Sequence, residues 1–493
     1  MIAGRVALPL LAFLSAVSLV VAPLVTAQRV DSIGPDVRKY LRVITPRVIL
    51  EHVTVIDGTG AKALPDRNVS IDGGTIAAIS NGAEVPPAEG TTVLELRGYS
   101  VMPGIVGMHD HLWYLARPNL AADGSYDSPG LALEMTFSAP RLYLANGVTT
   151  LRTAGSVAPY SDVRLKDAIE QGVLPGPHID VTGPYLNGRG NPNLQFPALR
   201  DADDARETVA FWAGRGVTSF KAYTQITRDE LRAAIAEAHR RGLKVTGHLC
   251  SVTYEEAVEA GIDNLEHGFS ANTALDRGRK LDTCSDSAGD ETLEQMIPGT
   301  AAATRLIAML VNHHVAITST LPGRASSLLD APVRPEVLEA MAPAARDAYQ
   351  SARNRPLAAS ARAKVALLQR REMDMERAFV AAGGLLLAGP DPVGIGGLIP
   401  GFGDHWEIEL LVEAGFTPVE AIRIATLNGA IFLGRADRIG SIAVGKSADL
   451  VVVKGDPAAR IADVEHVEIV FKDGMGYDPR KLLDSVKGRY GEY

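Results

Sequence analysis

Helix-like and strand-like patterns of apolar residues alternate through most of the chain. In one copy of the repeating unit, a helix begins at Thr227 and ends before Gly242, and an apolar strand follows over 244–248. The order Thr-x-x-Glu at its start is typical of a capping box, and the glycine is typical of a helix end. A second copy begins at Thr253 and continues into a strand over 263–267. This alternation is typical of an α/β fold with a parallel sheet.

Eight strands of this kind can be counted between Pro103 and Gly434. The first ends near His111, and the other seven cover 148–154, 178–183, 218–223, 244–249, 263–268, 315–321 and 384–391. Eight strands alternating with helices over about 330 residues predict a closed parallel (β/α)8 barrel of the TIM type. An open doubly wound sheet is the alternative, but no nucleotide-type glycine loop follows the first strand. We therefore expect residues 103–434 to form the main domain.

The chain on either side of this region has the period-two alternation of β strands. It is found in 44–102 and again in 437–475. Because the termini of a domain tend to lie close together, both flanks should join in one small β-sandwich domain. Residues 476–493 are expected to form a C-terminal tail. Two polar or alanine-rich stretches, 270–299 and 322–360, follow the sixth and seventh strands, and we expect them to cover an active site.

The first 27 residues have the composition of an export signal. Residues 1–27 combine one basic residue, an apolar run and a small-residue end at Ala27, which predicts a cleaved signal peptide. An uncleaved membrane anchor is the alternative. No later stretch is apolar for long enough to cross a bilayer, so we expect an exported protein, periplasmic or secreted, without stable membrane insertion after cleavage.

The net charge limits the kinds of partner the protein can bind, and its cysteines bear on the compartment in which it folds. The formal net charge of −9 argues against nucleic acid as a partner. Cys250 and Cys284 are the only two cysteines. An oxidising compartment permits a disulfide between them, and two unpaired thiols are the alternative.

Candidate metal ligands stand at the ends of five predicted strands, where the catalytic groups of a (β/α)8 barrel lie. His109 and His111 end the first strand, and residues two apart on a strand share a face. The remaining ligand-type residues are Lys221, His248, His267 and Asp391, at the ends of the fourth, fifth, sixth and eighth strands. Each has an ordinary explanation when taken alone, such as a core histidine or a turn aspartate. Their coincidence at strand ends favours a metal centre.

Three groups of residues carry a resemblance to a known family. They are the stretch 102–111, the ordered series Lys221, His248, Glu266-His267-Gly268 and Asp391, and the stretch 440–450. With them the sequence resembles the amidohydrolase superfamily over nearly all of the mature chain. The segment 409–422 is similar to the branch that holds the imidazolonepropionase-like, prolidase-like and ochratoxin-degrading amidohydrolases.

The resemblance implies a site for two divalent metal ions, usually zinc. His109, His111 and Asp391 would hold the first ion, and His248 and His267 would hold the second. Two nearby cations lower the pKa of a shared water, so that hydroxide is available near neutral pH, and one of them polarises the scissile carbonyl.

Lys221 is explained by the same resemblance, because an ammonium group cannot bind a metal ion. In this branch the matching lysine is carboxylated by carbon dioxide to N6-carboxylysine, a carbamate that bridges the two ions. Asp391 would be the catalytic base, since it would touch both metal and hydroxide and could return the proton to the leaving nitrogen.

Four residues near the strand ends are candidate substrate contacts. Trp113 and Tyr114 follow the first strand and would form an apolar wall, with packing at the barrel rim as the alternative. Arg189 and Arg324 lie in loops after the third and seventh strands. They would bind a substrate carboxylate, although loop arginines are often without a specific role. Many relatives have a histidine in the loop after the third strand, which 182–190 of this chain lacks.

These features predict a metal-dependent hydrolase that cleaves an amide bond of a small molecule or dipeptide. An N-acyl amino acid, an Xaa-Pro-like dipeptide and an ochratoxin-like amide all fit. A cyclic amide or lactone hydrolase on the same centre is the alternative, because one fold and metal centre can serve many substrates. A non-catalytic binding or scaffold barrel is disfavoured because every ligand-type residue is present. A homo-oligomer and a monomer both fit the sequence.

Overall fold

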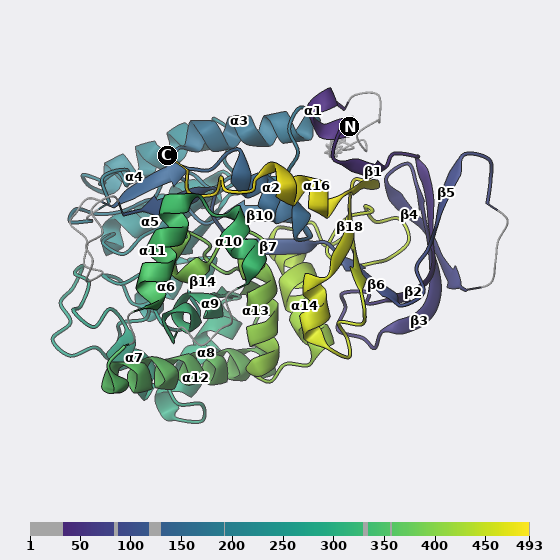
Figure 1. The fold of residues 1–493 in the computed structure, drawn as a ribbon. Helices are drawn as coiled ribbons and strands as arrows, with labels where there is room; N and C mark the ends of the chain where they lie inside the picture. Colours follow the sequence, from purple (N-terminus) through teal and green to yellow (C-terminus); the bar gives the residue numbers. More distant parts are fainter. Residues whose placement is uncertain are drawn as a thin grey trace, which may run out of the picture.

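A computed structural model describes most of the chain. The described residues are 33–82, 87–117, 130–191, 193–328, 334–354 and 357–492. The predicted signal peptide, 1–27, lies outside them. The described chain is divided into two portions (Figure 1). The large part contains both strands and helices, and the smaller part beside it is made of β strands.

The large part is built on eight parallel strands that alternate with helices. They are β7 (Ile105–Asp110), β10 (Val148–Thr153), β11 (His178–Asp180), β12 (Ser219–Ala222), β13 (Lys244–Gly247), β14 (Asn264–Glu266), β15 (Ala316–Ser319) and β16 (Leu386–Ala388). Each falls at one of the eight positions predicted from the sequence. The part therefore has a TIM-barrel-type α/β fold.

These eight strands pair in two parallel sheets, in the orders β11-β10-β7 and β12-β13-β14-β15-β16. At one junction, the Gly183 N–H donates to the Ser219 carbonyl at 2.9 Å. At the other junction, the Asp391 N–H donates to the His109 carbonyl at 3.1 Å. Only glycine fits at Gly389 there, because a Cβ would lie 2.2 Å from the His109 nitrogen. Strand pairing does not run unbroken around the described strands, so full closure of the barrel stays a prediction.

Helices surround the strands (Figure 1). They include α3 (Pro159–Glu170), α4 (Ala202–Ala213), α5 (Arg228–Arg240), α6 (Tyr254–Ala260), α8 (Ala301–Asn312), α12 (Ala359–Ala381) and α13 (Phe402–Glu413). Both predicted capping boxes are present, at Thr227 with Glu230 and at Thr253 with Glu256. Each N-cap is worth about 1 kcal/mol of helix stability.

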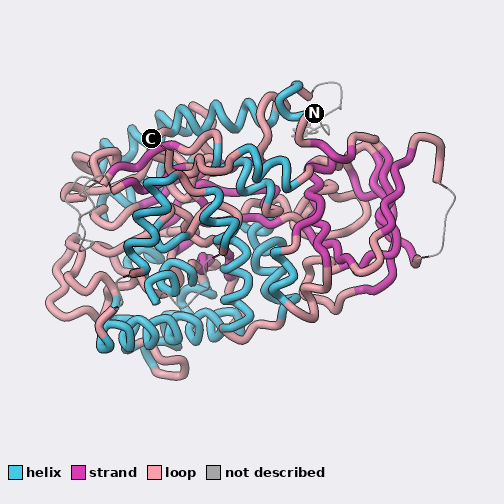
Figure 2. The backbone as a smooth tube through the Cα atoms, viewed as in Figure 1, coloured by secondary structure: helices cyan, strands magenta, loops and turns pink. Residues whose placement is uncertain are grey.

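In the smaller part, strands from both flanks of the chain pair with each other. Its strands are β1 (Leu41–Val43), β2 (Arg47–Val55), β3 (Leu64–Asp72), β4 (Thr75–Asn81), β5 (Thr91–Glu95), β6 (Tyr99–Pro103), β17 (Leu450–Lys454), β18 (Val467–Lys472) and β19 (Met475–Tyr477). The flanks meet where β6 pairs antiparallel with β17, placing Val101 opposite Val452. All nine belong to one hydrogen-bonded sheet, seen at one end of the molecule in Figure 2. A sandwich of two separate sheets stays a prediction.

The two predicted covering segments contain short helices. They are α7 (Asp290–Gln295) in the first, and α9 (Leu321–Ala325), α10 (Pro335–Ala340) and α11 (Pro343–Arg353) in the second. A disulfide joins Cys250 to Cys284 with a Cα separation of 4.8 Å. Of the two possibilities left open by the sequence, a disulfide or two unpaired thiols, the structure has the disulfide. The hairpin of β8 (Trp113–Ala116) and β9 (Leu131–Glu134) was not predicted from the sequence.

The end of the chain is packed against the large part. Within the predicted tail, 476–493, residues 476 and 477 belong to β19, and the described residues after it form α16 (Pro479–Ser485). Tyr490 is buried, and its hydroxyl donates to the Pro392 carbonyl at 3.0 Å. Among the described residues, no helix combines the length and the apolar character needed to span a membrane.

Candidate metal centre

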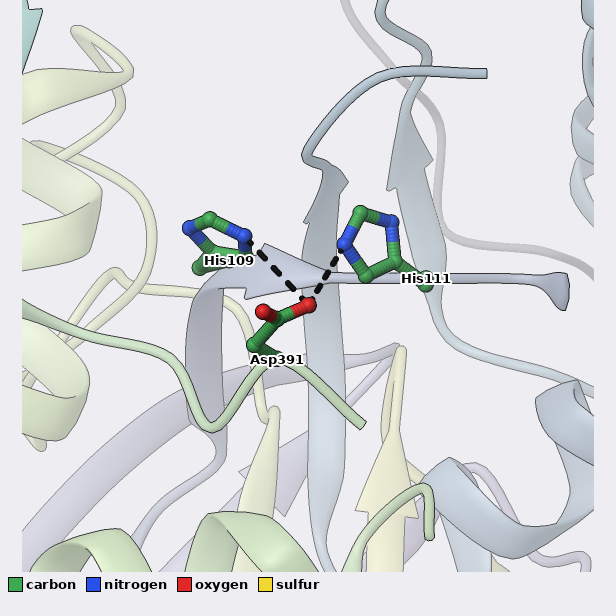
Figure 3. Close-up of side chains that lie close together, drawn as sticks. All are labelled: His109, His111 and Asp391. Atoms are coloured by element: carbon green, nitrogen blue, oxygen red, sulfur yellow. Dashed lines mark ion pairs between the residues drawn. The ribbon is translucent and has the colours of Figure 1, made fainter. Parts of the chain in front are cut away.

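His109, His111 and Asp391 meet at the carboxyl ends of β7 and β16 (Figure 3). One carboxylate oxygen, Asp391 Oδ1, lies 2.9 Å from His111 Nε2 and 3.6 Å from His109 Nε2. One ligand atom from each residue lies within 4.8 Å of the other two. Because side chains alternate along a strand, His109 on β7 and His111 just beyond its end share one face, and Asp110 points to the other.

Lys221, His248 and His267 complete this cluster. The Lys221 Nζ atom lies 3.1 Å from His109 Nε2. The His267 ring centroid lies 4.5 Å from that of His109 and 4.0 Å from that of His248. The structure therefore brings together all six residues that the sequence places at strand ends, and their roles as ligands stay predictions.

Burial lowers the pKa of the basic groups in the cluster. It lowers the pKa of His111 to about 4 and that of His248 to about 3. Burial also lowers the pKa of Lys221 to about 8, with Arg152 acting in the same direction. A metal ligand must be a neutral imidazole or a deprotonated group, so this environment suits metal binding.

The donor atoms fit a divalent cation of the zinc type. His267 Nδ1 hydrogen-bonds to Thr320 Oγ1 at 3.1 Å, while its Nε2 is buried without a partner among the described residues. A buried polar atom without a partner costs about 1–3 kcal/mol, which a bound cation would remove. Imidazole nitrogens with a carboxylate oxygen are the usual zinc ligand set.

Glu266 and Arg152 also support the cluster, and neither was given a role from the sequence. Glu266 Oε2 lies 2.8 Å from His109 Nδ1, and Glu266 Oε1 accepts from Arg152 Nη2 at 2.8 Å. Burial opposes the charge of Glu266, but Arg152 and then His109 outweigh it and hold its pKa well below the ordinary value. The sequence did indicate that Arg152 is unusual, because it is the one charged residue of a predicted strand, 148–154, that is otherwise uncharged.

A cavity of about 410 Å³ opens next to the cluster. Its lining includes His248, His267 and Asp391 from the strand ends, and Arg324, Gln369 and Glu372 from the covering helices. A cavity of this volume can hold a small molecule. Its wall combines polar side chains with apolar ones such as Leu321 and Val365.

The four candidate substrate contacts differ in position. Arg324 lines the cavity, and its Nη1 lies 3.2 Å from Asp290 Oδ1. The Trp113 ring lies 4.8 Å from the His111 ring. Tyr114 instead packs 5.7 Å from the Tyr490 ring, between ring centroids.

Arg189 is exposed and is not among the cavity-lining residues. The structure therefore brings Trp113 and Arg324 to the site and places Tyr114 in packing at the rim.

Comparison with known proteins agrees with this picture. Residues 100–475 match the model of the amidohydrolase family. A stretch of 65 residues is 43% identical to the imidazolonepropionase of Parabacteroides distasonis, and it covers 12% of this chain and 15% of that enzyme.

Solved structures resemble the chain over much greater lengths. A Bifidobacterium longum protein described as a candidate prolidase is 25% identical, with a TM-score of 0.63, over 90% of this chain and 99% of the other. The ochratoxinase of A. niger shares the fold at 17% identity, with a TM-score of 0.60, over 88% of this chain and 96% of the other.

Proposed function

The chain belongs to the amidohydrolase family, and from this premise we propose that it is a metal-dependent hydrolase of an amide bond in a small molecule or dipeptide. One observation carries the proposal. Three ligand atoms from His109, His111 and Asp391 converge within 4.8 Å of one another, and Asp391 also lines a cavity of about 410 Å³. His248 and His267 line the same cavity, so the candidate metal ligands and the space for substrate meet there.

We propose that the site holds two divalent ions of the zinc type, because the six clustered residues exceed what one tetrahedral ion needs. His109, His111 and Asp391 would hold one ion, His248 and His267 the other, and a carboxylated Lys221 would bridge them. Ions bound there supply Lewis acidity toward the amide carbonyl and lower the pKa of water.

Asp391 is the residue placed to move protons. Its side chain is 29% exposed, whereas His109 and His111 are almost fully buried. The carboxylate takes a proton from the attacking water as the carbon–oxygen bond forms. It returns that proton to the amide nitrogen as the carbon–nitrogen bond breaks.

The cavity favours a substrate with a carboxylate. Arg324 is the cation of its wall, and an arginine can bind a carboxylate through two parallel hydrogen bonds. An N-acyl amino acid, an Xaa-Pro-like dipeptide or an ochratoxin-like amide would fit this requirement. The stretch that is similar to imidazolonepropionases supports the alternative of a cyclic amide or lactone.

We also propose that the protein is exported. The disulfide between Cys250 and Cys284 supports export, because disulfides persist in oxidising compartments. The predicted signal over 1–27 agrees with it.

The test uses the full chain after signal removal. Metal content is measured first, with two zinc ions per chain expected, and turnover is then measured on N-acyl amino acids, dipeptides and lactones. Asp391→Asn should lose at least about 100-fold in kcat, the usual scale of general acid–base catalysis.

The control is Asp66→Asn, since Asp66 is another aspartate with positive φ, at 51° against 59° for Asp391, and it lies in the small sheet. Full turnover by Asp391→Asn, or by protein freed of metal, would refute the proposal.

A further inference from the structure

Arg152 crosses the interior of the large part to reach Glu266. It lies on β10, Glu266 lies on β14, and these strands belong to different parallel sheets. Arg152 is 1% exposed and Glu266 is fully buried. The Arg152 Nη2 atom donates to Glu266 Oε1 at 2.8 Å, while Arg152 Nε donates to the Met108 carbonyl at 2.9 Å. The guanidinium is therefore held at two points, one of them next to His109.

The second oxygen of Glu266 determines which nitrogen of His109 faces the cluster. Glu266 Oε2 lies 2.8 Å from His109 Nδ1. An ionised carboxylate can only accept, so Nδ1 must carry the ring proton. The other nitrogen, Nε2, then presents a lone pair toward Lys221 and Asp391, at 3.1 Å and 3.6 Å.

We propose that Arg152 is a positioning residue for the metal centre, acting through Glu266 on the tautomer and ring orientation of His109. The inference rests on the proposed function, because it takes His109 as a metal ligand. Without the guanidinium, Glu266 Oε1 would lose the Arg152 Nη2 donor that holds it at 2.8 Å, and the Glu266 side chain could turn away from His109. The His109 ring would then lose the contact of its Nδ1 with Glu266 Oε2, which fixes the ring so that Nε2 faces Lys221.

A purely structural role makes a different prediction. An ion pair between two sheets could serve only to stabilise the barrel, and its loss would then lower the unfolding temperature without changing affinity for metal. Residues that orient a ligating histidine typically change metal affinity by 10- to 100-fold when replaced. Metal affinity in a folded variant therefore separates the two roles.

The experiment measures affinity for Co²⁺ and Zn²⁺ on the full chain after signal removal, by the Co²⁺ visible spectrum and by competition with a chelator. Arg152→Met and Glu266→Gln should each weaken affinity by about 10- to 100-fold. The double variant should be no weaker than the worse single variant, because both changes break the same connection.

Arg334→Met is the matched control, because it removes an arginine–carboxylate pair away from the cluster, Arg334 Nη2 with Glu409 Oε2 at 2.9 Å. It should lower the unfolding temperature and leave metal affinity unchanged. If Arg152→Met does not fold, Arg152→Lys decides the matter, since lysine keeps the charge but lacks the fork that contacts Glu266 and Met108 together.

Affinity within twofold of wild type in the folded Arg152 variants would overturn the inference. That result leaves the proposed function intact, because wild type would still bind metal and hydrolyse amides. A wild-type protein that turns over substrate without metal would instead refute the proposed function itself.

Discussion

Cys284 is bonded to Cys250, which stands two residues after His248 at the end of β13. The disulfide therefore fixes the first covering segment to a strand end that contributes to the candidate metal centre. Ser270 and Ala288 of this segment line the cavity. Asp276 holds the same segment from within, since it accepts from the Gly289 N–H at 2.8 Å and from Thr292 Oγ1 at 2.7 Å.

Loss of the disulfide should destabilise the protein without unfolding the cover. The bonded cysteines are 34 residues apart, and closing a loop of this size in the unfolded chain is worth about 3–4 kcal/mol. The variant Cys250→Ser/Cys284→Ser should therefore lose about that much free energy of unfolding in urea, because Asp276 still orders the native segment. Reduced wild type serves as the control and should match the double variant. A loss under about 1 kcal/mol would contradict the prediction.

The positions of the eight strands were predictable because their signals are local. The capping box from Thr227 to Glu230 marks the start of one helix, and Gly242 marks its end. The position of the following strand in the sequence is therefore narrowly defined. The contact of Arg152 with Glu266 joins residues 114 apart. No local pattern pairs them, because the contact exists only once the two sheets face each other.

The helices that cover the cavity also depend on contacts between residues far apart in the sequence, which no local pattern predicts. Helix α12 begins at Ala359 and runs to Ala381, and it contributes Gln369 and Glu372 to the cavity. The prediction from sequence was only that 322–360 covers the site, and the stretch after it was given no role there. Alanine-rich sequence favours helix wherever it lies. Which side of such a helix faces the site depends on packing against distant strands.

Stability should fall as pH rises through the range in which Glu407 loses its proton. Burial raises the pKa of Glu407 to about 8 from an ordinary value of 4.5. The folded state therefore holds a proton that the unfolded state has released, and the stabilisation present below about pH 4.5 is lost as pH rises to about 8. The loss is at most about 1.4 kcal/mol per pH unit for this group.

Glu407→Gln should remove this part of the pH dependence. Urea unfolding at pH 5, 6.5 and 8 should show a smaller decline than in wild type, with the largest relative gain at pH 8. Glu413→Gln is the control, because Glu413 is exposed on the same helix, α13, and should keep the wild-type decline. If Glu407→Gln lost as much stability with pH as wild type, Glu407 would not be protonated in the folded protein.

Arg324 should determine how well a substrate carboxylate is bound. Its guanidinium lines the cavity, and Asp290 holds it in place with Oδ1 at 3.2 Å from Nη1. Lys364 Nζ lies 3.3 Å from the other oxygen of Asp290. Two cations therefore share the single negative charge of Asp290, which neutralises Arg324 only in part and leaves it able to attract a substrate carboxylate. A hydrogen bond between charged groups is worth about 1.5–3 kcal/mol.

Arg324→Met should therefore raise KM by roughly 10- to 100-fold for substrates with a free carboxylate, with little change in kcat, because the lost contact binds substrate and transition state alike. The matching substrates with the carboxylate converted to a primary amide should lose much less. Lys364→Met is the control, since it removes the neighbouring cation that is not among the cavity-lining residues. An equal rise in KM for carboxylate and amide substrates would show that Arg324 shapes the cavity without binding the substrate carboxylate.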